Sequence, residues 1–410
     1  MSEKKLSFPK NKIKVLLLEK IDTMAKSIFK KEGYEIETFD GSLNEKELSE
    51  KIKDISILGI RSKTIITKKV LQSANRLLSI GAYCIGINQI NLKECQKKGV
   101  IVFNAPFSNT RSVVEIVIAQ IIILMRNIIR KSNQMHKGIW EKDSINSYEI
   151  RNKTLGIIGY GNIGSQLSVV AESLGLKVIY YDILDKLSIG NAKKYNSIKK
   201  LLKECDILSI HVDGREGNTN LIGDKEINLM KKGAILINYS RGTIVNLNSL
   251  KRNLKNNKLL GAAIDVFPKE PLNKKEKFKS ELIGLNNVIL SPHIGGSTKE
   301  AQKNIGSFVP QKIIEYINSG NSSNSVNFPN LYLPKQKEAH RFIHIHKNEP
   351  GIMLKINKIL TDYNINIVGQ YLKTNESIGY VITDINNEYN KQVIQSLRKI
   401  HDTIRLRILY

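Results

Sequence analysis

Apolar runs alternate with amphipathic stretches through the first hundred residues. The apolar runs fall at residues 13–19, 34–39, 55–60, 77–83 and 99–106. Between them, stretches such as 22–33 and 45–54 repeat their apolar residues at the spacing of a helix face. Strands that alternate with helices predict a parallel sheet covered by helices.

A second series of apolar runs begins at Thr154, after a stretch beyond Asn104 that predicts a long helix. Its runs fall at residues 155–160, 177–182, 206–212, 234–240, 260–267 and 288–293. Six short strands separated by helical patterns predict a doubly wound α/β sheet of the Rossmann type.

The composition changes again near the end of the chain. Residues 318–338 are rich in Asn, Ser and Pro, which is typical of a linker. The pattern after the linker reads strand, helix, strand, strand, helix, strand. This βαββαβ order predicts an antiparallel sheet with two helices on one face.

The length of 410 residues fits two or three domains. The three cysteines show no CxxC spacing, which predicts neither a disulfide framework nor a metal site. Residues 1–12 are polar and charged, without the apolar core of a signal peptide, so we expect a cytoplasmic protein. The apolar run 113–125 contains Glu115 and Gln120, and predicts a buried helix rather than a membrane span.

The formal net charge is +26, a value that raises nucleic acid as a partner. The lysines are scattered along the whole chain, and no aromatic-interleaved basic stripe or basic tail occurs. We therefore expect no nucleic-acid partner and interpret the charge as a general Lys-rich bias of solvated faces. A positive field that attracts an anionic substrate is compatible with it.

The segment "GYGNIG" carries the first chemical signal, because Gly159, Gly161 and Gly164 directly follow an apolar run and precede a helical one. In a dinucleotide site, the first glycine permits the tight turn, the second lets the backbone approach a diphosphate, and the third allows close helix packing. Asp182 ends the next strand, at the spacing of a carboxylate that binds ribose hydroxyls, and favours NAD over NADP. The alternative is an ordinary turn followed by a helix-capping Asp.

Polar residues follow three later strands, where α/β sheets bind their ligands. They are Arg241, Asp265 and His293, and Glu270 lies between two prolines. A carboxylate paired with His293 would orient the imidazole and raise its pKa, so that it could take the proton of an alcohol during oxidation. Arg241 could hold a substrate carboxylate or carbonyl oxygen through two hydrogen bonds. Taken singly, each of these is equally well an ordinary polar loop residue.

The segments "GYGNIG", "YYD", "NYSRGTIV", "AAIDVFPKEP" and "SPHIGGST" together resemble the D-isomer-specific 2-hydroxyacid dehydrogenase family. The resemblance implies that Arg241, Glu270 and His293 are the catalytic residues. It also implies a set of residues that bind NAD: Gly159, Gly161, Asn162, Ile163, Gly164, Asp182, Tyr239, Asp265, Gly295 and Gly296.

Further segments, "GIRSKT", "IGAYCIGINQI", "NAPFSNTRSVVE" and "SVNFP", are similar to a branch of that family with a phosphorylated substrate. The similarity implies NAD-dependent oxidation of 3-phospho-D-glycerate to 3-phosphooxypyruvate, the first step of L-serine biosynthesis, with a side reduction of 2-oxoglutarate. The substrate's carboxylate and phosphate would be bound by Arg61, Ser62, Lys63 and Gly81.

The same resemblance implies three domains and a homotetramer. The substrate domain, of flavodoxin-like fold, would comprise residues 1–106 and 297–330, the nucleotide domain 107–296, and an ACT regulatory domain 338–410. The segment "HIHKNEPG" is similar to the stretch at which such ACT domains bind L-serine. His346, Asn348 and Asn366 match its polar contacts, whereas Glu349 stands where relatives often carry a basic residue. An ACT domain kept mainly for assembly is the alternative.

Two other functions stay open on the sequence alone. One is a different D-2-hydroxyacid dehydrogenase, such as a hydroxypyruvate reductase. The other is a non-enzymatic NAD-sensing protein of the corepressor type, against which the three filled catalytic positions argue.

Overall fold

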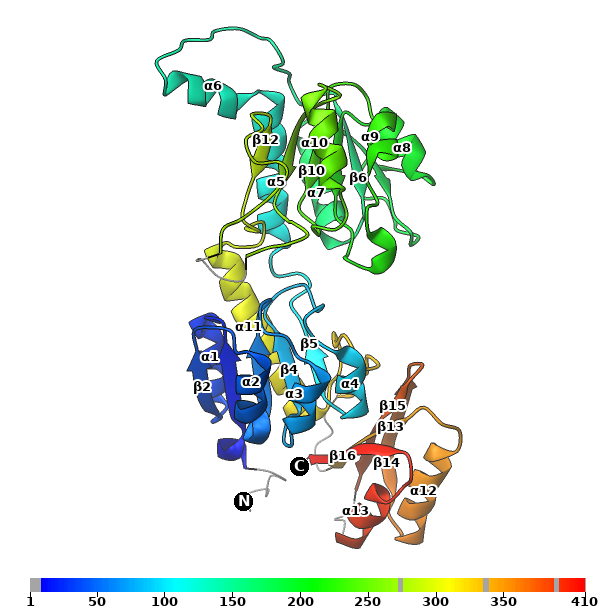
Figure 1. Cartoon of the computed structure of the whole chain (residues 1–410). Helices are drawn as coiled ribbons and strands as arrows, with labels where there is room; N and C mark the ends of the chain where they lie inside the picture. Colours follow the sequence, from blue (N-terminus) through cyan, green and yellow to red (C-terminus); the bar gives the residue numbers. More distant parts are fainter. Residues whose placement is uncertain (1–8, 272–275, 335–338, 387–390, 410) are drawn as a thin grey trace. The chain divides into compact units, whose positions relative to one another are not determined.

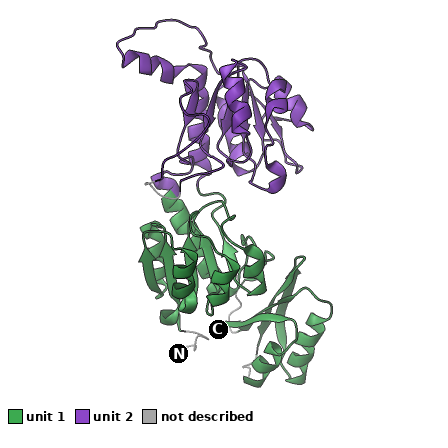
Figure 2. Cartoon of the chain, viewed as in Figure 1, with its two compact units in different colours: residues 1–108, 302–410 green, residues 109–301 purple. Residues whose placement is uncertain are grey.

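The computed structural model describes residues 9–271, 276–334, 339–386 and 391–409. The chain forms two compact units, residues 1–108 with 302–410 and residues 109–301 (Figures 1 and 2). Parts of the sequence predictions fall outside the described residues: residues 1–8 of the polar N-terminal segment, 272–275 of the expected nucleotide domain, 335–338 where the expected linker ends and the ACT domain is expected to begin, and 387–390 and 410 of that domain. The division into three domains stays a prediction.

The first unit contains a five-stranded parallel sheet of strand order β2-β1-β3-β4-β5. Its strands are β1 (Lys14–Leu18), β2 (Glu35–Phe39), β3 (Ile57–Ile60), β4 (Ser79–Ala82) and β5 (Ile101–Phe103). Its helices are α1 (Thr23–Lys31), α2 (Glu45–Lys51), α3 (Lys68–Ser73), α4 (Leu92–Lys97) and α11 (Lys299–Ser319). The sheet that the alternating pattern predicts is therefore confirmed.

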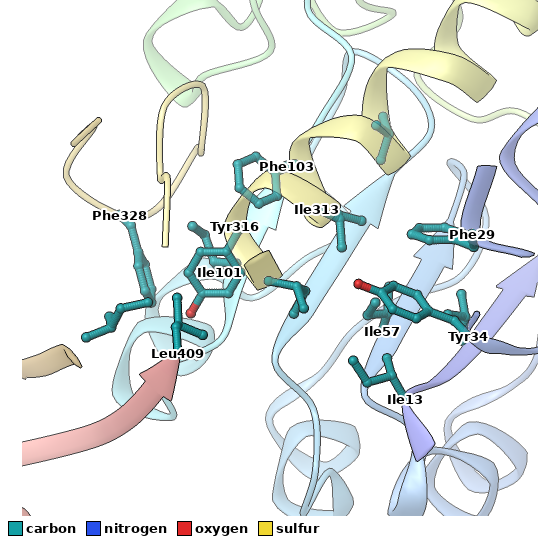
Figure 3. Packing of buried hydrophobic residues seen from close by; sticks show 14 of the residues in the cluster. Ile13, Phe29, Tyr34, Ile57, Ile101, Phe103, Ile313, Tyr316, Phe328 and Leu409 are labelled. Atoms are coloured by element: carbon teal, nitrogen blue, oxygen red, sulfur yellow. The ribbon is translucent and has the colours of Figure 1, made fainter. Parts of the chain in front are cut away.

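Both faces of this sheet are buried. On one face, Phe29 of α1 and Tyr316 of α11 pack with strand residues such as Ile57 and Phe103 (Figure 3). On the other face, Leu48 of α2, Val70 of α3 and Cys95 of α4 pack in a second apolar cluster. This two-sided burial explains why β3, β4 and β5 read as short apolar runs, whereas the edge strand β2 is mostly exposed and alternates apolar with polar residues.

The C-terminal region folds as the predicted βαββαβ unit, with antiparallel strands in the order β14-β15-β13-β16. Its elements are β13 (His340–Lys347), α12 (Ile352–Asp362), β14 (Ile367–Thr374), β15 (Ile378–Ile385), α13 (Lys391–Arg398) and β16 (Thr403–Leu409). Leu409 also contributes to the core around α11 (Figure 3).

The second unit contains a seven-stranded parallel sheet of order β12-β11-β10-β9-β6-β7-β8, which confirms the doubly wound fold. Its strands are β6 (Thr154–Ile158), β7 (Lys177–Tyr181), β8 (Lys193–Lys194), β9 (Ile207–Ile210), β10 (Ala234–Asn238), β11 (Leu259–Ile264) and β12 (Val288–Leu290). Its helices are α5 (Thr110–Met125), α6 (Ile128–Met135), α7 (Asn162–Ser173), α8 (Ile198–Glu204), α9 (Asp224–Leu229) and α10 (Leu247–Lys255).

Helices α5 and α7 cover one face of this sheet, and α8, α9 and α10 cover the other. The long apolar helix expected after Asn104 is α5, which ends before Asn127, a residue with φ of 52° that begins α6. In the described ranges, no single helix has the length and apolar character to cross a membrane. By those two criteria alone, α5 and α6 qualify only as a pair, with a bend of 66°. Short 3-10 helices cover Lys10–Lys12, Ile52–Asp54 and Glu216–Asn218.

Candidate active site

The glycine-rich segment forms the turn between β6 and α7. Gly159 has φ of 93°, and a Cβ atom there would lie 2.6 Å from the carbonyl oxygen of His211. A Cβ atom at Gly164 would collide with the carbonyl oxygen of Gly159. Gly161, the N-cap of α7, has open space where its Cβ would be. The amino end of α7 is thus unobstructed, which fits the diphosphate of a dinucleotide.

Asp182 follows β7 and lies beside this turn. Its Oδ2 accepts a hydrogen bond of 2.7 Å from the backbone N–H of Tyr160, and its Oδ1 accepts one of 2.8 Å from Leu184. Asn162 and Ile163 are the first two residues of α7. The structure therefore brings together the predicted diphosphate and ribose residues.

Asp265, directly after β11, organises the loop that carries His293. The residue is 1% exposed, and its carboxylate accepts hydrogen bonds from Ser291 Oγ at 2.6 Å, Ile294 N at 2.9 Å and Gly295 N at 2.8 Å. Burial raises the pKa of Asp265, and these donors counteract the rise. The buried carboxylate therefore ties the 291–295 loop to the end of β11.

Tyr239 lies against the same loop. Its hydroxyl is 3.2 Å from Ser291 Oγ, and burial raises the pKa of Tyr239 to about 12. A Cβ atom at Gly295 would lie 2.9 Å from the Tyr239 ring, and one at Gly296 would collide with the amide of Asn109. The two glycines let the loop pass close to Tyr239 and to the start of α5.

His293 and Glu270 form the central pair of the site. The distance from His293 Nδ1 to Glu270 Oε2 is 2.8 Å, and Glu270 Oε1 accepts from the backbone N–H of Phe267 at 3.1 Å. The two side chains are 49% and 37% exposed, which leaves the imidazole accessible from one side. His293 itself has φ of 54°, the left-handed region. The pairing expected from the sequence is present.

The pair shifts the acidity of both members. The hydrogen bond to Glu270 raises the pKa of His293 above its usual range, against the effect of partial burial. Partial burial opposes ionisation of Glu270, but the hydrogen bond and the charge of His293 lower its pKa. The imidazole is thereby made a stronger base with a fixed orientation.

Arg241 follows β10, and its Nη1 donates to the carbonyl oxygen of Ser240 at 2.7 Å. Its positive charge lowers the pKa of both Glu270 and His293, so it is close enough to act on the pair. Gly242 packs directly on the carbonyl group of Phe267, where a Cβ atom would collide. This contact holds the Arg241 turn against the segment that carries Glu270.

The predicted substrate residues of the first unit differ in exposure and in the strands that carry them. Arg61, Ser62 and Lys63 follow β3, and the side chains of Ser62 and Lys63 are exposed. Gly81 is buried within β4, where a Cβ atom would lie 2.6 Å from the side chain of Val309. This close packing accounts for a glycine at position 81, and its contact with substrate stays a prediction.

The predicted effector residues lie around the end of β13. His346 is 2% exposed, and burial lowers its pKa, which favours a neutral ring. Asn348 donates to the carbonyl oxygen of Asn375 at 2.9 Å. Asn366 is exposed just before β14, and across the described ranges no hydrogen bond joins it to His346 or Asn348.

One residue of each unit that contacts predicted site residues was not singled out from the sequence. Ser291 links Asp265 to Tyr239, a role visible only once the loop is folded. Glu19 is 8% exposed and binds the backbone of the loop that begins at Arg61. Its only signal is a carboxylate that ends an otherwise apolar run.

Comparisons with known proteins agree with this geometry. Residues 118–295 match the profile of the D-isomer specific 2-hydroxyacid dehydrogenase NAD binding domain, and residues 342–405 match an AHAS small subunit-like ACT domain. D-3-phosphoglycerate dehydrogenase from Dictyostelium discoideum is 47% identical over 98% of this chain and 99% of its own. The enzyme of that name from Escherichia coli K12 is 45% identical over 99% of this chain and 100% of its own.

The chain belongs to the D-3-phosphoglycerate dehydrogenase family. Solved structures of more distant relatives agree with the fold. D-2-hydroxyisocaproate dehydrogenase has a TM-score of 0.67 at 26% identity and covers 77% of this chain and all of its own. D-lactate dehydrogenase from Aquifex aeolicus, complexed with NAD and lactic acid, has a TM-score of 0.67 at 25% identity with the same coverage. The family and the NAD cofactor predicted from the sequence are confirmed.

Proposed function

We propose that the chain oxidises the C2 hydroxyl of 3-phospho-D-glycerate to the ketone of 3-phosphooxypyruvate with NAD, the first step of L-serine biosynthesis. The observation that carries this proposal is the 2.8 Å contact between His293 and Glu270, in an NAD-binding domain of the family. Relatives that match almost the full length carry the name D-3-phosphoglycerate dehydrogenase, which supports the choice of substrate.

The residues around the glycine turn fit NAD. The amino end of α7 at Gly161 would hold the diphosphate, Asp182 the ribose hydroxyls, and the Tyr239–Gly295 contact the nicotinamide end. When bound, the nicotinamide supplies the acceptor for the hydride that leaves C2 of the substrate.

His293 acts as the general base in this proposal. Its Nδ1 is engaged by Glu270, so its Nε2 is the nitrogen that takes the proton of the C2 hydroxyl. Glu270 fixes the ring orientation and stabilises the imidazolium that forms. In the reverse direction, the same nitrogen returns the proton to the carbonyl oxygen.

Arg241 binds the substrate carboxylate in this proposal, because a guanidinium can donate two parallel hydrogen bonds to it. Arg61, Ser62 and Lys63 supply further contacts to the anionic groups. This assignment makes the phosphate of the substrate a determinant of specificity.

Substrate choice is tested by comparing kcat/KM for 3-phospho-D-glycerate with that for unphosphorylated D-glycerate. We expect a preference of at least about tenfold for the phosphorylated substrate, since each charged hydrogen bond contributes about 1.5–3 kcal/mol. Equal values for the two substrates would reject the phosphoglycerate assignment in favour of another D-2-hydroxyacid dehydrogenase. A measurable rate with 2-oxoglutarate and NADH would establish the proposed side reaction.

The base is tested with His293→Ala, for which we expect a loss of about 10²–10⁴-fold in kcat while NADH still binds. His401→Ala, at an exposed histidine of the C-terminal region, is the matched control and should retain full activity. Unchanged turnover in the His293 variant would reject the mechanism.

We also propose that the ACT domain binds L-serine between the domains of two copies, in a homotetramer. The buried ring of His346, whose pKa is lowered by burial, and the polar side chain of Asn348 at the end of β13 support an amino-acid ligand there. Inhibition of oxidation by L-serine and the mass in solution by light scattering are the two tests. Lack of inhibition by L-serine would favour an ACT domain that serves assembly.

A further inference from the structure

Strand β1 ends in an unusual turn. Glu19 and Lys20 have φ values of 62° and 52°, so two successive residues that are neither glycine nor asparagine adopt the left-handed region. Single non-glycine residues of this kind are uncommon, and they persist where surrounding contacts determine the conformation. The backbone N–H of Glu19 donates to the carbonyl oxygen of Gly41 at 3.0 Å, which supports the turn.

The turn directs the Glu19 side chain into the loop that follows β3. Glu19 Oε1 accepts from the backbone N–H of Thr64 at 2.8 Å and from that of Arg61 at 3.3 Å. Glu19 Oε2 accepts from the backbone N–H of Lys63 at 3.0 Å. The residue is only 8% exposed, so this carboxylate is largely withdrawn from water. Hydrogen bonds from backbone amides to an ionised carboxylate are among the stronger ones in proteins.

The opposite side of the loop is held as well. Gln89 Nε2 donates to the carbonyl oxygen of Arg61 at 2.7 Å. The backbone of residues 61–64 is thus fixed on both sides, while the side chains of Ser62 and Lys63 remain exposed. Such convergent amides usually form an anion-binding concavity for a ligand, but here the anion belongs to the chain itself.

We propose that Glu19 is a positioning residue for substrate recognition, an inference that rests on the proposed function. The carboxylate occupies the backbone N–H groups of Arg61, Lys63 and Thr64, so these three are not available to a substrate anion. Recognition of the substrate's phosphate or carboxylate by this loop then falls to the side chains of Arg61, Ser62 and Lys63, which Glu19 holds in place.

Two possible roles of Glu19, as a negative charge near the substrate or as a support for the loop, predict opposite effects of its removal on substrate binding. If its charge mattered only through the local field, removing it would strengthen the binding of an anionic substrate. If Glu19 positions the loop, its removal weakens binding, because the amide nitrogen of a glutamine side chain faces backbone N–H groups and cannot accept from them. The sign of the change in KM therefore distinguishes the two roles.

The experiment compares the full-length wild type with Glu19→Gln. We expect KM for 3-phospho-D-glycerate to rise about tenfold, with KM for NAD and the affinity for NADH unchanged, because small displacements of substrate-binding groups have large effects. The matched control is Glu35→Gln, which makes the same charge change at an exposed residue of β2. Its KM values should equal those of the wild type.

Each outcome has one meaning for the proposal. A lower or unchanged KM for 3-phospho-D-glycerate in Glu19→Gln would overturn it, as would reduced kcat with unchanged KM, which indicates fewer folded molecules. Where that variant does not fold, Glu19→Asp retains the charge one methylene further back, and the same rise in KM is expected in smaller measure. Absence of phosphoglycerate oxidation by the wild type would instead reject the proposed function.

Discussion

At the scale of single residues, the site depends on how Glu270 changes the chemistry of His293. An imidazole that donates to a carboxylate is more easily protonated, and the raised pKa of His293 reflects that hydrogen bond. Asp265 also raises this pKa, whereas Arg241 lowers it. Glu270 has the largest influence on the pKa of His293, so a substitution of Glu270 should change the pH dependence of catalysis.

We expect Glu270→Gln to shift the pH profile of kcat/KM for alcohol oxidation to lower pH. The base must be neutral to accept a proton, so activity in the wild type rises with pH through the raised pKa of His293. Without the carboxylate, that pKa falls, and the rising limb moves with it. The maximal rate should also fall, because the ring orientation is less fixed. A rising limb at the same pH in both enzymes would contradict this role of Glu270.

The sequence identifies the chemical residues better than their conformations. Arg241 and His293 were predicted from their places after strands, Glu270 as a carboxylate partner for His293, and all three from the family resemblance. The left-handed φ of His293 and the bridge that Ser291 makes from Asp265 to Tyr239 were not. Both depend on contacts between segments far apart in the chain, about which local residue patterns carry no information.

At the scale of elements, the turn between β6 and α7 shows why its glycines are required. Gly159 lies against the backbone of His211 at the end of β9, and Gly164 lies against Gly159 itself. The strand, turn and helix can approach closely only without side chains at these two positions. Gly161, at the amino end of α7, has no atom within 4 Å of the place that a Cβ would take.

We expect Gly159→Ala to destabilise the second unit by about 1–3 kcal/mol and to weaken NADH binding, because alanine is strained at positive φ and its Cβ would meet the His211 carbonyl. Urea unfolding and NADH titration measure the two effects. Gly233→Ala is the control, since Gly233 also has positive φ but no atom lies within 4 Å of the place that a Cβ would take. The control should lose some stability and keep its affinity for NADH. Normal NADH affinity in Gly159→Ala would contradict the packing argument.

Strands that are buried on both faces of the sheet were predicted correctly from their apolar residues. Strands such as β9 and β10 are wholly buried and read as unbroken apolar runs. The edge strand β8 consists of two exposed lysines and was not predicted. Its pairing with β7 is set by the position of the neighbouring strand, since its own side chains carry no strand signal.

At the scale of the whole first unit, a buried arginine that is ion-paired within the C-terminal sheet also links this sheet to the segment before it. Arg341 of β13 and Asp384 of β15 are 5% and 1% exposed, and their side chains meet through bonds of 2.7 and 2.8 Å. Arg341 also donates to the carbonyl oxygens of Ser319, the last residue of α11, and of Leu333 and Pro334 beyond this helix. The Arg341 guanidinium therefore donates hydrogen bonds both to a carboxylate within the sheet and to carbonyl oxygens of the segment that precedes the sheet in the chain.

We expect Arg341→Met to destabilise the first unit by about 3–5 kcal/mol, because it leaves the Asp384 carboxylate buried without its partner. Adding Asp384→Leu should restore part of this loss. It should not restore all of it, since the carbonyl groups of Ser319, Leu333 and Pro334 still lack their donor. Arg151→Met, which removes an exposed pair with Glu149, is the control and should cost less than about 1 kcal/mol. Urea unfolding of the full chain measures the free energy of unfolding of all three variants. If Arg341→Met lowers this free energy as little as the control does, Arg341 does not hold the C-terminal sheet in place.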